Sequence, residues 1–391
     1  MAGREGVLLL GDGAPRPWRL LHVFATFDVG GPQVRTLAVC RELGGRYEHA
    51  FVAADGRCGA TSLLQDWAPP VYALQRPASA WEQLRRMRTW IREFRPDLVL
   101  SYNWGAMMGA VAAITCGVPL VHHEEVVPSQ ERDGPLRRRE WLRRRVLPRA
   151  RAVVCVASRM VDTAVRRWSV PRARCHWIAN GVAPPADSVE RRCQAGRQLV
   201  VGCVAHARPE KNWLRLIRAF ARLRDGAAKL LLVGDGPQRE DAAKLARALG
   251  VAERIEMVGA VPDPNPWYRR MHVFALPSDD EQHPIALLEA MSHGLPVVAT
   301  DVGDVRRTLP AIQQGLVCKT AEHGAPVAST REDGFSRALA RLVGDAALRE
   351  RLGEANRVHV ERYFGLATVA ERYAGVYDGA ISGEVREGVM A

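Results

Sequence analysis

The sequence contains no uninterrupted apolar stretch long enough to cross a membrane. The longest candidate, residues 107–121, is broken by Gly109, Thr115 and Gly117. The first residues, MAGREGVLLLGDG, lack the apolar core of a signal peptide. We therefore expect a cytoplasmic protein that is at most peripheral on the inner face of the cytoplasmic membrane.

Clustered cysteines are also missing. The eight cysteines are scattered, with no C-x-x-C pair and no Cys/His group at the spacing of a metal site. Buried, reduced thiols are the ordinary outcome for such residues. The sequence therefore predicts neither a disulfide framework nor a metal centre, and we expect no cofactor.

Aromatic residues are few, at 6%, and most basic runs have none between them. The net charge of +12 nevertheless favours an anionic partner, which can be nucleic acid, anionic lipid or a phosphorylated ligand. Because no motif for binding RNA or DNA accompanies this charge, we expect no nucleic-acid partner.

The length of 391 residues is comfortable for two domains. Short apolar runs alternate with amphipathic helices up to about residue 183, and the pattern restarts at LVVGCVAHARPEKN after the polar segment 184–197. Strands separated by helices imply parallel sheets covered on both faces. We predict α/β architecture: a Rossmann-like domain over residues 1–185, a second over 186–361, and a terminal segment 362–391. Ligands bind such sheets at the carboxyl ends of the strands, so the two halves are expected to face one cleft.

The segment EQHPIALLE places Glu281 just before a helix that begins at a proline, and Glu289 one turn inside it. The first amides of that helix, at Ile285, Ala286 and Leu287, are expected to form an anion site. Glu289 can accept hydrogen bonds from a diol, and Glu281 can reach a group attached beyond the anion. A diol, an anion and further hydroxyls describe a nucleoside diphosphate sugar. The alternative is one capping acid and one surface acid.

Two loops can complete such a site. HARPEKN offers Arg208 and Lys211, three residues apart, to a diphosphate. FDVGGPQVR offers Gly30 and Gly31, which allow close approach of a ligand to the backbone before a helix begins. A solvated basic loop and a plain glycine turn are the respective alternatives.

Together these motifs resemble the retaining glycosyltransferases of family 4, which have the GT-B fold of two Rossmann-like domains with parallel sheets facing a central cleft. The resemblance covers nearly the whole chain and includes PSDDEQHPIALLEAMSHGLPVVATDVGD, HARPEKN, VGDGP, VGAV and WIANGV. It implies that Glu289 holds the donor ribose and that Glu281 lies by the donor sugar. It also implies that Arg208 and Lys211 neutralise the leaving diphosphate, which the loop of Gly30 and Gly31 approaches from the other domain.

The resemblance further implies a metal-independent reaction, because the cations and the helix start replace a metal at SDDE. The acceptor it suggests is lipid-linked or an oligosaccharide, and the terminal segment is expected to form a helix that crosses back onto the first domain. His123 in PLVHHEE matches the histidine that commonly faces donor sugar and acceptor in the family; a structural histidine and a metal ligand are the alternatives. The sequence departs from the family pattern at Gln282, His283 and Ala183, which leaves the identity of the donor sugar open.

Three other functions remain to be weighed. LLLVGDGPQ resembles a dinucleotide-binding turn but lacks the third glycine, and Asp235 between its glycines would repel a pyrophosphate. Sugar-nucleotide 2-epimerases share the architecture but need no acceptor. A basic nucleic-acid-binding protein is the alternative that is not an enzyme.

The segment RDGPLRRREWLRRRVLPRAR, Arg132–Arg151, combines nine arginines with two acids. On a helix, its four aliphatic residues fall within an arc of about 140°, and Trp141 lies opposite them. These four residues are Leu136, Leu142, Val146 and Leu147. An apolar stripe flanked by arginine predicts a helix that lies on an anionic membrane. The alternative is an ordinary domain helix whose stripe packs on the sheet, and both can hold if only the arginines meet lipid.

Overall fold

The computed structural model describes residues 16–74, 79–125, 136–185, 198–223, 226–319 and 329–384. The chain forms two compact units, one of residues 1–178 with 369–391 and the other of residues 179–368. The sequence predicted domain limits at residues 185 and 361, whereas the two units divide after residues 178 and 368. No helix in the described ranges is both long and apolar enough to span a membrane.

Unit 1 is built on a parallel sheet of seven strands in the order β3-β2-β1-β4-β5-β6-β7. Its strands are β1 (Trp18–Phe24), β2 (Tyr47–Ala53), β3 (Val71–Ala73), β4 (Leu98–Tyr102), β5 (Leu120–Glu124), β6 (Ala152–Cys155) and β7 (Cys175–Trp177). Its helices are α1 (Gly31–Leu43), α2 (Ala80–Phe94), α3 (Met107–Cys116), α4 (Arg137–Val146), α5 (Ser158–Trp168) and, from Val369 on, α13 (Leu366–Ser382).

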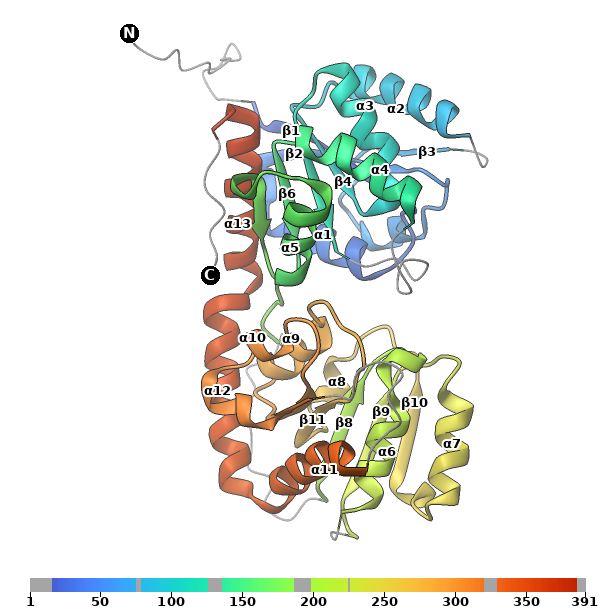
Figure 1. The fold of residues 1–391 in the computed structure, drawn as a ribbon, viewed down its shortest axis with the longest axis vertical. Helices are drawn as coiled ribbons and strands as arrows, with labels where there is room; N and C mark the ends of the chain where they lie inside the picture. The colour runs from blue at the N-terminus through green and yellow to red at the C-terminus, as the bar shows by residue number, and fades with distance from the viewer. Residues whose placement is uncertain are drawn as a thin grey trace. The chain divides into compact units, whose positions relative to one another are not determined.

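Unit 2 repeats this plan with six parallel strands in the order β10-β9-β8-β11-β12-β13 (Figure 1). The strands are β8 (Val200–Val204), β9 (Lys229–Val233), β10 (Ile255–Gly259), β11 (Val273–Leu276), β12 (Val297–Thr300) and β13 (Val317–Cys318). The helices are α6 (Trp213–Ala221), α7 (Arg239–Ala248), α8 (Asn265–Tyr268), α9 (Ile285–Ser292), α10 (Val305–Thr308), α11 (Ser329–Gly344) and α12 (Ala346–Phe364).

Alternate residues of the unit 2 strands enter two separate cores, as the period of two of a strand requires. Cys203, Leu232 and Ala275 pack with α6, α7 and α11, whereas Leu231 and Phe274 pack with α9 and the end of α12 on the other face. Both faces are therefore buried, which explains why these strands read as continuous apolar runs. The prediction of two parallel-sheet α/β domains is confirmed.

The sheet of unit 1 has one mainly apolar face and an opposite face that carries His22, His49 and His123. The apolar face packs Leu21, Val52 and Val99 against α2, α3 and α5. On the opposite face His22 contacts Cys40 of α1, and His123 contacts Tyr373 and Tyr377 of α13. The last helix thus covers the histidine-bearing face of unit 1.

Candidate functional site

The order of strands in unit 2 places its chemistry at one edge of the sheet. β8 pairs with both β9 and β11, so the chain leaves β8 and β11 in opposite directions along the sheet. Such a switch point opens a crevice at the carboxyl ends of the two strands. The loop with Arg208 and Lys211 follows β8, and the loop with Glu281 follows β11. The sheet order therefore brings together two motifs about 70 residues apart in sequence.

Hydrogen bonds and ion pairs tie these two loops to each other. Lys211 Nζ lies 2.7 Å from Glu281 Oε1. Asn212 Nδ2 donates to Asp279 Oδ2 at 2.8 Å, and Arg215 forms an ion pair with Asp279 at 2.6 Å. The Asn212 side-chain oxygen at the same time caps α6 by accepting from the Arg215 amide. Nothing in the sequence indicated the contacts among Asn212, Arg215 and Asp279, because only the fold shows that these residues face one another.

Glu281 is a buried carboxylate with polar support. Its side chain accepts from Ser278 Oγ at 2.8 Å as well as from Lys211. Gly303 fits against its backbone: at φ +54° a Cβ on this glycine would lie 2.3 Å from the Glu281 carbonyl oxygen. The Asp304 amide, next in the chain, donates to the Gln282 carbonyl at 3.0 Å. The backbone of the Glu281 loop is thus fixed from two sides.

Arg208 differs from Lys211. Its side chain is exposed, and no ion pair or side-chain hydrogen bond involves it within the described ranges. The loop that carries it is shaped by the glycines of VGDGP, since a Cβ on Gly234 would lie 2.0 Å from Ala205 O and one on Gly236 2.8 Å from Ala207 O. These glycines therefore allow the loop after β9 to pack closely on the loop after β8. This role differs from that of the glycines in a dinucleotide-binding turn.

The helix α9 begins at Ile285, with Pro284 as its N-cap. The amides of Ile285 and Ala286 have no partner inside a helix that starts there, whereas the Leu287 amide donates to Pro284 O at 3.2 Å. Leu287 thus does not join the anion site. Glu289 lies one turn further, where Tyr268 OH donates to its Oε2 at 2.7 Å. Burial raises the pKa of Glu289, and the Tyr268 hydrogen bond opposes that rise.

His283 replaces the aromatic residue of the family pattern and is buried. Its Nδ1 accepts from the Asn180 amide at 3.3 Å, and its Nε2 lies 3.1 Å from Thr308 Oγ1. Thr308 Oγ1 donates its own hydrogen to Asp304 O, so the hydroxyl oxygen accepts from His283 Nε2–H. The Asn180 side chain also donates to the His283 carbonyl at 2.6 Å. His283 therefore anchors the segment WIANGV to the start of α9.

The glycine loop lies in unit 1 between β1 and α1. Gly30 is the N-cap of α1 in extended conformation, and Gly31 is its first residue. A Cβ on Gly31 would meet no atom within 4 Å, so the space beside it is open. The Gln33 side chain closes the turn by donating to Thr26 O at 2.7 Å. Contact between this loop and a ligand stays a prediction.

His123 is 1% exposed at the end of β5. Its ring stacks on Tyr102 at 4.6 Å and on Tyr373 at 5.6 Å between centroids, and its Nε2 lies 3.4 Å from Tyr377 OH. Its Nδ1 is buried and has no hydrogen-bond partner among the residues that the structure describes. Burial lowers the pKa of His123 well below its usual range, and the Arg35 charge adds to this. Such surroundings are those of a structural histidine, which was one of the alternatives for His123. Contact between His123 and a sugar stays a prediction.

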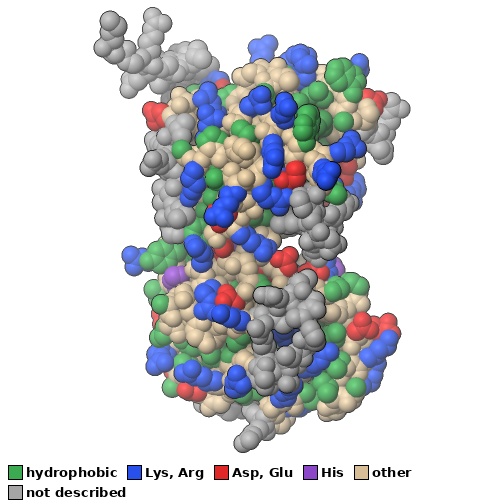
Figure 2. Space-filling view, in the orientation of Figure 1, with side chains coloured by type: hydrophobic (Ala, Val, Ile, Leu, Met, Phe, Trp, Pro, Cys, Tyr) green, Lys and Arg blue, Asp and Glu red, His purple; other side chains and the backbone are tan. Residues whose placement is uncertain are grey.

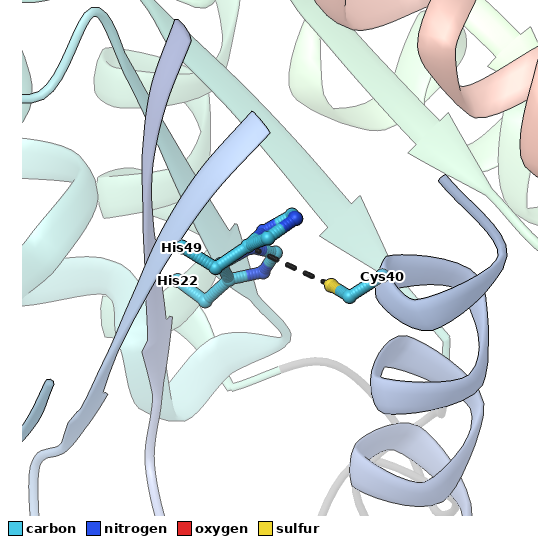
Figure 3. Close-up of side chains that lie close together, drawn as sticks. All are labelled: His22, Cys40 and His49. Atoms are coloured by element: carbon cyan, nitrogen blue, oxygen red, sulfur yellow. Dashed lines mark hydrogen bonds between the residues drawn. The ribbon is translucent and has the colours of Figure 1, made fainter. Parts of the chain in front are cut away.

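One group of metal-type ligands occurs in the described ranges: His22 on β1, Cys40 on α1 and His49 on β2 (Figure 3). Their ligand atoms lie within 4.8 Å of one another, and all three side chains are buried. His22 Nε2 and His49 Nδ1 are 2.9 Å apart and hydrogen-bonded to each other. His22 Nδ1 also bonds Tyr102 OH at 2.9 Å. We assign this group to the core as a hydrogen-bonded chain.

Of the basic segment Arg132–Arg151, residues 132–135 lie outside the described residues. The aliphatic residues of α4 and the turn after it point inward: Val146 and Leu147 are buried and Leu142 packs on the core. Leu136 and Trp141 are exposed. The prediction that these aliphatic residues enter a membrane is therefore wrong for Leu142, Val146 and Leu147. The alternative, a domain helix whose apolar residues pack inward, is correct for them.

Arg143 is also internal, at 1% exposure, instead of flanking the stripe. It forms ion pairs with Glu124 and Glu140, both at 3.4 Å, and lies over the rings of Trp104 and Trp168. A helical wheel cannot show this, because the acids that receive the guanidinium come from another element and from the preceding turn.

Both halves of the chain match known glycosyltransferase domains. Residues 30–181 match the model of the glycosyl transferase 4-like domain, and residues 198–345 match that of glycosyl transferases group 1. The fold and these domains define a glycosyltransferase of the GT-B type. Within that class, the chain belongs to the proteins that combine a 4-like domain with a group 1 domain.

Individual relatives agree with this class. The 2-deoxystreptamine N-acetyl-D-glucosaminyltransferase of Streptomyces fradiae is 29% identical over 86% of this chain and 90% of its own length. The lipopolysaccharide core biosynthesis mannosyltransferase LpcC of Rhizobium leguminosarum bv. viciae is 31% identical over 49% of this chain and 54% of its own length.

Solved structures share the fold. HepE of Anabaena, in complex with UDP and glucose, has a TM-score of 0.73 at 20% identity, covering 92% of this chain and 99% of its own. WaaG, a glycosyltransferase involved in lipopolysaccharide biosynthesis, has a TM-score of 0.69 at 17% identity, covering 92% and 100%.

Proposed function

We propose that the protein is a retaining, metal-independent glycosyltransferase that moves a sugar from a nucleoside diphosphate sugar to a lipid-linked or oligosaccharide acceptor. The observation that carries the proposal is the group at the switch point of unit 2. An exposed guanidinium (Arg208) and a lysine paired with a buried carboxylate (Lys211 and Glu281) lie on the two loops that follow β8 and β11, and a half-buried carboxylate (Glu289) lies on α9, the helix that follows the second loop.

Each of these groups suits one part of such a donor. Arg208 presents a planar fork of N–H donors to a diphosphate, and the first amides of α9 add the positive end of the helix dipole. Glu289 uses Oε2 to accept from Tyr268 and can accept from a ribose diol with its other lone pairs. Glu281 contributes the carboxylate for sugar hydroxyls.

The chemical step breaks the bond between the anomeric carbon and the diphosphate oxygen, and the acceptor oxygen forms the new bond while its proton passes to the departing diphosphate. Negative charge grows on the departing diphosphate. Fixed cations and helix amides stabilise such charge without rearranging during the reaction. Arg208, Lys211 and the amides of Ile285 and Ala286 supply this stabilisation, and Gly30, Gly31 and His123 are proposed to complete the site from unit 1.

A thermal-shift screen against a panel of nucleotide sugars identifies the donor, because a ligand that binds only the folded state raises the melting temperature. Transfer in the presence of EDTA then tests metal independence, and the NMR coupling of the product's anomeric proton tests retention. Strict dependence on Mg²⁺ or Mn²⁺, or an inverted product, would contradict the mechanism. Conversion of the donor without any acceptor would indicate a 2-epimerase instead.

The outer face of α4 supports an acceptor held in a membrane. Arg137, Arg138, Arg144 and Arg145 are exposed around Trp141, which is 59% exposed. None of these four arginines has a carboxylate partner in the part of the chain that the structure describes. Figure 2 shows basic side chains gathered over this part of unit 1.

An exposed indole among such arginines fits the boundary between lipid head groups and acyl chains. The indole is amphipathic and settles there, and each arginine near an anionic surface contributes about 1 kcal/mol. We therefore propose that α4 docks on an anionic membrane with Trp141 at its centre. A soluble acceptor like that named for the Streptomyces fradiae relative needs no such surface.

Co-sedimentation with phosphatidylcholine vesicles containing or lacking phosphatidylglycerol tests this docking. We expect wild type to bind only the anionic vesicles, and at least tenfold less at 0.5 M salt than at low salt, because the Debye length falls to a few ångströms. Changing the four outer arginines of α4 to Gln should abolish binding, and Trp141→Ala should weaken it.

The matched control changes four exposed helical arginines of unit 2 to Gln and should bind like wild type. These are Arg218, Arg247, Arg341 and Arg351. Equal loss in both quadruple variants would mean that net charge, not the α4 face, attracts the vesicles. Failure of wild type to bind anionic vesicles would remove the membrane from the proposal and favour a soluble acceptor.

A further inference from the structure

The two cations of the donor site are in different states. Arg208 is exposed and has no ionic partner among the residues that the structure covers. Lys211 Nζ lies 2.7 Å from Glu281 Oε1, and the two side chains are 25% and 8% exposed. An ion pair this short and this shielded neutralises most of the lysine charge toward a third group. With this pair formed, the site offers a diphosphate one full cation instead of two.

Of the two partners, Glu281 is the fixed one. Ser278 donates to the same carboxylate oxygen, and Gly303 packs against the Glu281 carbonyl. The neighbouring Asp279 amide is held by the Glu210 carbonyl at 2.7 Å. Lys211 has a flexible four-carbon stem and an ammonium that makes the same contact in any rotation. Any exchange of partners therefore moves the lysine and leaves the carboxylate in place.

We propose that Glu281 holds Lys211 away from the diphosphate until a donor sugar occupies the site. The inference rests on the proposed function, in which Glu281 receives hydroxyls of the donor sugar. Those hydroxyls compete for the oxygen that Lys211 and Ser278 contact, and the released ammonium turns to the diphosphate. The second cation thus arrives only with a complete donor.

The arrangement makes affinity depend on the sugar. A nucleoside diphosphate without sugar leaves the Lys211–Glu281 pair intact and binds through Arg208, the α9 amides and Glu289 alone. The diphosphate product, which has lost its sugar, is therefore held more weakly than a site with two free cations would hold it. Release of this product is a frequent limit on turnover in well-evolved enzymes.

The direction in which the Glu281→Gln substitution changes diphosphate affinity tests the holding role of Glu281. In the Glu281→Gln variant, the amide oxygen can still accept from Ser278, but Lys211 loses its counter-charge. We expect the affinity for UDP, GDP, ADP or dTDP, whichever the wild type binds, to rise about five- to tenfold in isothermal titration. Affinity for the corresponding nucleoside, which has no phosphate, should stay unchanged, while sugar transfer falls. Melting temperatures measured alongside show that the variant is folded.

Two further variants sharpen the result. Lys211→Gln should change diphosphate affinity by no more than about twofold, whereas Arg208→Gln should reduce it at least tenfold. Glu253→Gln removes an exposed carboxylate elsewhere in unit 2 and serves as the charge-matched control, expected to leave affinity unchanged. A tighter Glu253→Gln variant would assign the effect to net charge and overturn the inference.

The outcomes separate this inference from the function on which it rests. If wild type binds a nucleoside diphosphate and transfers sugar but Glu281→Gln binds it equally or more weakly, the holding role of Glu281 is wrong and the function stands. Equal losses of affinity in Lys211→Gln and Arg208→Gln would overturn the holding role in the same way. If wild type binds none of the four diphosphates and transfers no sugar, both proposals fall.

Discussion

The carboxyl ends of the two sheets carry contrasting chemistry. In unit 2, Arg208 is exposed, and Lys211 and Glu281 form an ion pair at the edge of the sheet. In unit 1, His123 is enclosed by Tyr102, Tyr373 and Tyr377, and burial keeps it neutral. Two sheets of the same plan thus present different surfaces, because helix α13 covers one face of the first sheet with tyrosines.

The order of the strands thus determines where in each unit a binding site can form, and the side chains there determine what it can bind. Unit 2 has its switch point at β8 and β11, and charged loops follow both strands there. Unit 1 has the equivalent switch point at β1, which pairs with β2 and β4, but the residues there are glycines and buried aromatics. Three predictions test this contrast.

The largest expected effect concerns the exposed cation of unit 2. Arg208→Ala should lower kcat about 10²–10³-fold, because a fixed cation stabilises the charge that develops on the leaving diphosphate. Steady-state kinetics with the identified donor measure this effect. Arg218→Ala on the exposed side of α6 is the control and should keep wild-type kcat. A loss below tenfold in Arg208→Ala would assign the diphosphate to other groups.

The next effect concerns Glu289. Glu289→Ala should weaken nucleoside diphosphate binding by about 2–3 kcal/mol, because hydrogen bonds from a diol to a charged carboxylate are strong. Glu289→Gln should be milder, since the amide keeps one acceptor oxygen. Titration calorimetry gives both affinities, with the exposed Glu253→Ala as control. Unchanged affinity in Glu289→Ala would remove this residue from the ribose site.

The smallest expected effect is a loss of stability of unit 1 in acid. Burial lowers the pKa of His49 to about 4. The unfolded chain, with a histidine pKa of about 6.5, therefore binds a proton more readily than the fold between these values, so stability falls as pH drops through that window. His49 alone should cost about 2 kcal/mol at pH 5 relative to neutral pH. His22, whose pKa burial also lowers, adds to the loss.

Hydrogen exchange followed by mass spectrometry resolves this loss by segment. Peptides covering β1 and β2 should lose protection between pH 7 and pH 5 after correction for the intrinsic exchange rate. The His49→Leu variant removes one of the titrating groups and should show a shallower dependence. An equal dependence in wild type and variant would mean that His49 does not remain neutral in the fold.

Much of the fold followed from local patterns. Apolar runs predicted β1, β2, β4, β5 and β6 of unit 1 and β8 to β12 of unit 2, because strands of a parallel sheet are buried on both faces. The short strands β3, β7 and β13, of two or three residues, were not predicted as strands. Strands of that length carry too few residues to show a period, and pairing with a neighbour creates them.

For the site, the sequence indicated the residues but not their partners. The E-x7-E spacing and the proline before α9 pointed to Glu281, Glu289 and the anion site at the helix start. That Lys211 is paired while Arg208 is exposed could not be inferred, since the two lie three residues apart on one loop and look equivalent. Tyr268, which holds Glu289, carries no motif and was missed.

The sequence by itself determined the class of protein and the identity of its charged groups, because spacing along the chain fixes which residues share a strand end or a helix start. Only the tertiary structure decided which of these charges are neutralised, buried or left free. The α4 helix shows the reason: Arg143 is buried on Glu124 while Arg144 beside it is exposed. Successive residues on a helix point about 100° apart, so the elements packed around them, which come from distant parts of the chain, decide the environment of each charge.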